Sequence, residues 1–266
     1  VDGTINSELI NTYKTSDSIW NIFARMFKDC VSLEKIPTLQ KTKISHGDFQ
    51  NVFNSCVSLK EATLPGFIEN TSFSFYNIPT ISNIYNGIFD RCVSLEKING
   101  FYPNLTTVSN IYYDMFKYCV SLKEICELNV SPVEQSYVNM FYGCKSLTSA
   151  VLKFNEVGKQ GSDSVLGSCF QMFKNCSNLN NVEVEFIDWN NKYKYEGADI
   201  ESIITDSSTD GSILPILPTY NWMDNVAKEG TFVCYTQLPH STEYLNNPTF
   251  IPWGKVSLRP DKNNYF

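Results

Sequence analysis

The sequence predicts an α/β solenoid in which short helices or turns alternate with short parallel strands. One observation is a repeated pattern: at six places in the 266-residue chain, a Phe is followed three residues later by Cys and six residues later by Leu. The repeated residues are Phe27, Phe53, Phe89, Phe116, Phe141 and Phe173. The second observation is their spacing of 26, 36, 27, 25 and 32 residues, a period in the twenties with insertions. Stacked rungs of this size, one per repeat, are typical of a leucine-rich-repeat solenoid.

The apolar segment around each repeated Phe is predicted to form one or two helical turns. Apolar residues stand four and one residues before the Phe and three after it, as Tyr112, Met115, Phe116 and Cys119 do in the fourth rung. This i, i+3, i+4, i+7 spacing lies on one face of an α-helix. Because so short a helix is unstable alone, we expect its stability to come from packing on neighbouring rungs.

The segment after the repeated Leu is predicted to be a short strand. Residues 181–186, NVEVEF, alternate with period two, which is typical of a half-buried strand. Strands of successive rungs would lie about 4.8 Å apart in a parallel sheet. Adjacent Glu and Lys residues recur just after the Leu and indicate a solvated outer face. The acidic members are Glu34, Glu61, Glu96 and Glu124.

The column of six cysteines, one in each rung, is predicted to consist of buried free thiols. Cys is small and often fully buried, so it suits a crowded position where the helix approaches the strand. Disulfides or a metal array are the alternatives, although the sequence has no C-x₂-C pair and an odd total of nine Cys. The six are Cys30, Cys56, Cys92, Cys119, Cys144 and Cys176.

The composition argues against two classes of partner. A net charge of −7 and a pI of about 4.9 disfavour nucleic-acid binding, which requires clustered Lys and Arg. No apolar stretch approaches the roughly 18–20 residues that span a bilayer. We therefore expect no nucleic-acid partner and no membrane-spanning segment in this chain.

The repeated pattern MFxxCxSLxxI resembles the BspA-like leucine-rich repeats of surface proteins from host-associated anaerobic bacteria. The resemblance covers residues 20–186, where every rung has Phe, Cys and Leu. It implies an exported protein at the cell surface or outside the cell, since family members are mostly predicted to be exported and some are described as adhesins. The start, VDGTINSELI, has no signal-peptide features, so we expect the targeting segment to have been removed.

Residues 220–234 resemble the degenerate final rung of such arrays. Trp222 and Met223 stand in the Met-Phe places, and Glu229 replaces the Leu. A charged residue in place of an apolar one suits a cap that faces water. Phe232 falls where Val182 lies in the preceding rung.

The resemblance and the insertions together suggest four segments. They are a flank at 1–15, the six-repeat solenoid at 16–189, a loop excursion at 190–219, and the degenerate terminal repeat with an irregular C-terminal cap at 220–266. We expect Trp253 to pack on the end of the solenoid.

No catalytic, cofactor-binding or metal-binding residues are predicted. The two histidines, His46 and His240, stand outside any recognisable motif. Asp206 and Asp210 lie near DSSTDG, which lacks the ligand spacing of a calcium loop. The sequence therefore favours a protein that is not an enzyme and holds no cofactor.

The expected function is recognition or adhesion at the cell surface, with an extracellular host or microbial protein, or a glycan, as partner. The candidate interaction surface is Tyr102, Tyr113, Tyr118 and Tyr142, because exposed Tyr gives a rigid amphipathic contact. The simpler interpretation of each ring is packing on neighbouring rungs. An accessory carbohydrate-binding module and a structural spacer of a larger surface protein are the alternatives, and the chain is expected to be monomeric.

Overall fold

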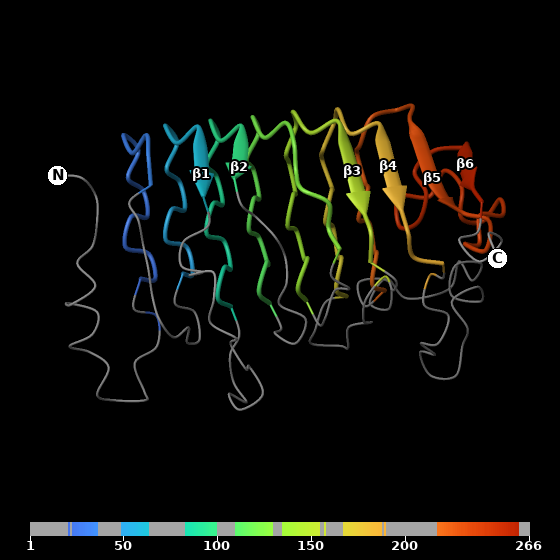
Figure 1. Ribbon diagram of the computed structural model, residues 1–266, viewed down its shortest axis with the longest axis horizontal. Coiled ribbons are helices and arrows are strands. Elements are labelled where there is room, and N and C mark those ends of the chain that lie inside the picture. Colours follow the sequence, from blue (N-terminus) through green and yellow to red (C-terminus); the bar gives the residue numbers. More distant parts are fainter. Residues whose placement is uncertain are drawn as a thin grey trace.

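The protein is a row of rungs stacked in chain order (Figure 1). The computed structural model describes residues 21, 23–36, 49–63, 83–99, 110–129, 135–154, 157, 167–187, 189 and 217–260. The strands are β1 (Glu61–Thr63), β2 (Lys97–Asn99), β3 (Ser149–Leu152), β4 (Asn181–Val184), β5 (Thr231–Tyr235) and β6 (Val256–Arg259). They lie along one edge of the row, as a leucine-rich-repeat solenoid requires, and confirm the predicted parallel strands.

The strands form two parallel sheets, β1–β2 and β3–β4–β5–β6. The residue columns seen in the sequence set the register. Ala62 pairs with Ile98 in the first sheet, and Val182 pairs with both Ala150 and Phe232 in the second. Phe232 therefore occupies the predicted place beside Val182.

An extra residue in the fourth rung separates the two sheets. Leu128 bridges to Leu152 of β3, but it lies six residues after the Leu of its rung, whereas Leu152 lies five after Leu147. An extra residue of this kind acts like a β-bulge, which interrupts the pairing of neighbouring strands.

The apolar segments are successive turns, and the predicted short helices are not confirmed in the described rungs. Residues with positive φ recur at every fourth position, as Asn110 (54°), Asp114 (54°) and Tyr118 (59°) do in the fourth rung. A right-handed helix needs negative φ throughout, so these residues divide the segment into turns. Asn, Asp and Gly fill many of these positions because they tolerate left-handed backbone.

Backbone donors in the turns alternate between their own rung and the next one. The N–H groups of Met115 and Lys117 donate to carbonyls three residues earlier, each at 3.2 Å. The N–H groups of Asp114, Phe116 and Tyr118 instead donate to carbonyls of the fifth rung at 3.0, 2.9 and 2.7 Å. Because every second donor finds its acceptor on a neighbour, stacking is what satisfies the backbone of each rung.

The repeated Phe residues form the predicted stacked column in the core. Neighbouring rings from Phe27 to Phe173 are 5.5–5.8 Å apart, with interplanar angles of 12° or less. All of them are buried except Phe27, which is partly buried at the first rung. A second aromatic column runs beside it from Phe23 to Tyr137.

The cysteine column consists of free thiols, as predicted, but each buried thiol also makes a directed contact. The Sγ of Cys119 donates to the carbonyl of Phe89 in the preceding rung at 3.0 Å, and Cys56, Cys92, Cys144 and Cys176 repeat this contact at 3.0–3.1 Å. The prediction of burial is wrong for Cys30, which is exposed at the first rung.

The C-terminal end is covered by aromatic residues from the final coils. Trp189 and Trp222 pack edge to face at 6.2 Å, and Trp189 also stacks on Tyr244. Trp222 and Met223 are buried, whereas Glu229 is exposed in the place of the Leu. This rung has the predicted apolar and charged residues, but it is not the last one, because the Met223 N–H donates to the Pro248 carbonyl of a further coil at 3.1 Å and β6 of that coil pairs with β5.

Trp253 packs over Gly230, the residue that follows the exposed Glu229. Its ring lies against Gly230, where an added Cβ would come within 2.5 Å of the indole. The indole N–H donates to the Ala227 carbonyl at 2.8 Å, and the side chain is 3% exposed. Just beyond it, β6 pairs with β5, so the segment expected to be irregular contains a strand.

Several predicted features lie outside the described residues. They are the flank at 1–15, residues 190–216 of the loop excursion, His46, Tyr102, Asp206 and Asp210. The predicted domain boundaries stay a prediction.

Candidate functional site

Two of the candidate tyrosines meet on the turn side of the solenoid. The rings of Tyr118 and Tyr142 are 5.3 Å apart at an interplanar angle of 76°. Arg91 lies over the Tyr118 ring and Lys117 over the Tyr142 ring, each 5.9 Å from the ring centroid. We call these four residues, from three successive rungs, the turn-face patch.

The repeat explains why these side chains are neighbours. Arg91, Tyr118 and Gly143 stand at the same position of the third, fourth and fifth rungs, two residues after the repeated Phe. Lys117 and Tyr142 share the position one residue earlier. Stacking the rungs places each residue beside its counterpart, and the backbone bond from Tyr118 N–H to the Tyr142 carbonyl at 2.7 Å holds them in register.

Gly143 provides the room that the Tyr118 ring occupies. A Cβ at this glycine would lie 2.7 Å from Cδ1 of Tyr118, and its φ of +74° favours glycine in any case. Tyr118 itself has a φ of 59°, and Arg91 one of 61°. Left-handed backbone at a bulky residue costs about 1–2 kcal/mol, and the same column has it in other rungs, as at Ser55 and Asn175.

Acidic side chains lie beneath the patch and balance its cations. Arg91 is 3.5 Å from an oxygen of Asp90, and Lys117 is 3.2 Å from Asp114. Asn54 also donates to Asp90 at 3.0 Å. Burial raises the pKa of Asp90 from its ordinary value, although the charge of Arg91 opposes this. The patch is therefore an aromatic surface with paired charges.

Burial and the neighbouring Tyr142 raise the pKa of Tyr118 above its ordinary value. Like any tyrosine hydroxyl near neutral pH, it is protonated and can donate a hydrogen bond. Tyr113 is half-buried on the same turn segment, and burial raises its pKa too. It makes no ring contact with the other two tyrosines in the described part of the chain. The structure thus joins two of the predicted residues and leaves Tyr113 apart.

The sequence interpretation missed Arg91, Lys117 and Gly143. The aligned rungs contained a signal, because Gly143 stands in the same column as Tyr118, one rung later. A Gly at that position leaves room for the Tyr ring of the preceding rung.

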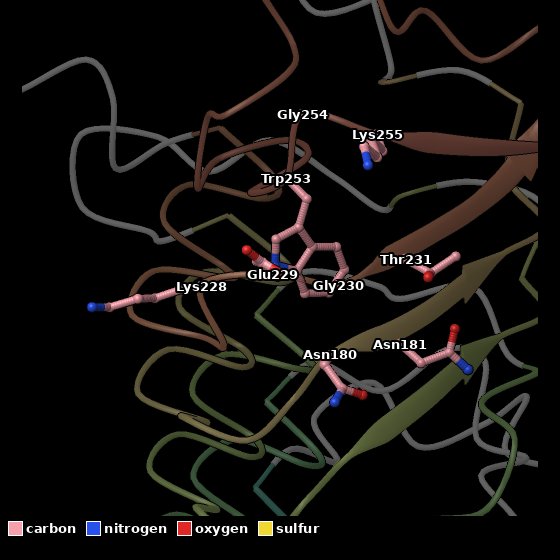
Figure 2. A pocket seen from close by; sticks show the side chains of 9 residues that line it. All are labelled: Asn180, Asn181, Lys228, Glu229, Gly230, Thr231, Trp253, Gly254 and Lys255. Carbon is pink, nitrogen blue, oxygen red and sulfur yellow. The ribbon is translucent and has the colours of Figure 1, made fainter.

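A second surface feature is a hollow of about 730 Å³ beside the ends of β4 and β5, which we call the corner pocket. Figure 2 shows side chains from three successive coils around it, with the Trp253 ring beside Glu229 and Gly230. Its remaining lining residues are Asn180, Asn181, Lys228, Thr231, Gly254 and Lys255.

Other chemistry finds little support in the described ranges. They hold no group of three or more His, Cys, Asp or Glu residues that is suited to a metal ion. A ring nitrogen of His240 contacts the Leu238 carbonyl at 2.6 Å, which is a local structural contact. Within the same residues, no helix has the length and apolar character needed to cross a membrane.

Comparison with known proteins agrees with the architecture. The model of the BspA type leucine rich repeat region matches six copies over residues 5–85 and 67–171, together more than half of the chain. A leucine rich repeat protein of T. pallidum, known from its crystal structure, is 17% identical over 60% of this chain and 71% of its own, and its TM-score of 0.25 adds no argument. No curated protein matches significantly. On its repeats, the chain belongs to the BspA-type leucine-rich repeat family.

Proposed function

We propose that this chain is a non-enzymatic recognition and adhesion module that binds an extracellular protein through the turn-face patch. Leucine-rich repeat domains in general mediate protein interaction, and an exported, surface location follows from the family resemblance. The partner is a protein of the host or of another microbe. The chain acts as a monomer whose rigid rungs hold the binding residues in place.

The observation that carries this proposal is the construction of the patch. Tyr118 and Tyr142 are only partly buried, and the Arg91 side chain is 58% exposed. Tyr and Arg dominate the binding energy of many protein interfaces. Here they are ordered before binding by ring contacts and by the backbone ladder, which lowers the entropy lost on association.

The ring geometry favours a protein partner over a sugar on this surface. A site that stacks sugar rings on aromatic side chains needs coplanar rings, whereas the two tyrosines are almost perpendicular at 76°. Perpendicular rings instead form an uneven surface that side chains of a protein can fill. The paired charges around them supply a polar rim.

The test is a binding screen of the purified chain against extracellular-matrix proteins at physiological salt. Each protein that binds is titrated against Tyr142→Ala and Arg91→Ala, and we expect each change to weaken binding by about tenfold or more. Lys145→Ala is the matched control, because Lys145 is an exposed residue of the same rung outside the patch. Equal unfolding midpoints would show that the variants keep their fold.

If every partner binds the wild type and both patch variants with the same affinity, the turn-face patch is not the binding surface. Silence against all matrix proteins would favour the structural-spacer alternative.

A further inference from the structure

The corner pocket differs from the equivalent surface of the other rungs. Two positions follow the repeated Leu in each rung. In the first four rungs both are charged, one Lys and one Glu: Glu34 and Lys35, Lys60 and Glu61, Glu96 and Lys97, Lys123 and Glu124. In the later rungs they are Thr148 and Ser149, Asn180 and Asn181, Gly230 and Thr231. The repeated, solvated charges thus give way to neutral hydrogen-bonding side chains.

These neutral side chains form one strip across the sheet. Ser149 pairs in register with Asn181, and Asn181 with Thr231. All three are exposed. Figure 2 shows Asn181 and Thr231 on neighbouring strands, with Lys255 beyond Thr231. The strip therefore continues from the strands into the corner pocket.

The polar groups of the pocket are available to a ligand. In the part of the chain that the structure describes, the side chains of Asn180, Asn181 and Thr231 hydrogen-bond to no protein group. Neither Lys228 nor Lys255 forms an ion pair among those residues, and both are exposed. With Glu229 as the one acidic lining residue, the wall carries a net charge of +1 (two Lys and one Glu).

We infer that the corner pocket and its neutral strip bind an acidic oligosaccharide, one whose sugar units carry carboxylates. Amide and hydroxyl side chains match the many hydroxyls of a glycan as donors and acceptors. Lys255, with Lys228 at the rim, attracts the carboxylate. The hollow of about 730 Å³ is within the range of about 300–1,000 Å³ that is usual for small-ligand sites.

An acidic peptide fits this surface less well. Protein partners are anchored by large apolar or aromatic side chains in complementary pockets, but Trp253, the one aromatic lining residue, is only 3% exposed and already packs on Gly230. The wall offers hydrogen bonds and positive charge rather than an apolar hole. This site is separate from the turn-face patch and does not depend on the protein partner proposed above.

The test is calorimetric titration of the full chain with tetragalacturonate, with its methyl ester as the neutral match. We expect saturable binding of the acid, weakening with salt because the ionic contacts are exposed, and binding of the ester that is about five- to tenfold weaker. The double change Lys228→Gln and Lys255→Gln should weaken binding about five- to tenfold, the sum of two exposed ionic contacts. Asn181→Ala should weaken it about two- to tenfold through a lost hydrogen bond.

Controls separate this site from general charge attraction and from the turn-face patch. Lys145→Gln removes an exposed lysine elsewhere and should leave the affinity for tetragalacturonate unchanged. Arg91→Ala, which tests the patch, should also leave it unchanged. The inference is overturned by no saturable binding of the acid, by equal binding of acid and ester, or by a loss in Lys145→Gln equal to that in the pocket variants. A sulfated tetrasaccharide that binds more tightly than the carboxylated one would overturn the assignment of carboxylate as the recognised group.

Discussion

Gly143→Ala is expected to destabilise the solenoid by two separable effects. The first is the backbone: φ at this position is +74°, and left-handed backbone costs an L-residue about 1–2 kcal/mol. Ala also has less conformational freedom than Gly in the unfolded chain, which contributes about 0.4–1 kcal/mol of stability. This gain offsets part of the backbone cost. A net backbone effect of about 1 kcal/mol remains.

The second effect is steric. The new Cβ would lie 2.7 Å from Cδ1 and 3.1 Å from Cε1 of Tyr118, both of them ring carbons. The ring also contacts Tyr142 and Arg91, so moving it disturbs the whole turn-face patch. Overpacking of this kind costs about 1–3 kcal/mol, and partial exposure of Tyr118 favours the lower end. The total for Gly143→Ala is therefore about 2–3 kcal/mol.

A double-mutant cycle with Tyr118→Ala separates the two effects. In the Tyr118→Ala background the clash is gone, so Gly143→Ala should cost only about 1 kcal/mol. Urea unfolding of the four proteins gives the coupling from their midpoints, provided that the m-values agree. A coupling below about 0.5 kcal/mol would refute the steric explanation.

Three further predictions test the core and its titrating groups. Phe116→Ala should lower the free energy of unfolding by about 3–5 kcal/mol, whereas Phe27→Ala, at the partly buried end of the column, should cost clearly less; equal losses in urea unfolding would contradict the stacked core. In the native protein at mildly alkaline pH, a maleimide should label Cys30 quickly and Cys56 slowly, because burial raises the pKa of Cys56 to about 11; rapid labelling of several thiols by mass spectrometry would contradict this. Burial raises the pKa of Asp90 in the folded protein above the ordinary carboxyl value of 3.8. Above the raised pKa, the ionised carboxylate lowers the free energy of unfolding. This destabilisation is relieved as the pH falls toward 3.8 and the carboxyl of the folded protein takes up a proton. Asp90→Asn should thus be more stable than the wild type at neutral pH, with a difference that shrinks on acidification; a difference that grows would be inconsistent with this sign.

The sequence by itself determined the repeat architecture and the residue columns. A residue that recurs once per rung must occupy the same place in each rung, so Phe, Cys and Leu could be assigned to the core without coordinates. The same reasoning assigned Trp222, Met223 and Glu229 to a degenerate rung, in which the first two are buried and Glu229 is exposed, but it did not predict the further coil whose β6 pairs with β5. It also indicated Tyr118 and Tyr142 as surface candidates, because they stand next to core positions without belonging to them.

The conformation of the apolar segments was decided only by the tertiary structure. Residues four and one before the Phe and three after it lie on one face both of a helix with 3.6 residues per turn and of a coil that repeats every four residues. Apolar spacing therefore cannot distinguish the two. The structure has the four-residue coil, with positive φ at every fourth position, and stacking is what makes it stable, since the acceptor of the Tyr118 N–H is 24 residues away at Tyr142.

Both surface sites depend on this stacking for the same reason. Arg91, Tyr118 and Gly143 are far apart along the chain and become neighbours because equal positions of successive rungs lie next to each other. Asn181, Thr231 and Trp253 meet at the corner pocket because the last coil packs its indole over Gly230. The sequence determined which side chains occupy each rung, and the contacts between rungs determined which of them can act together.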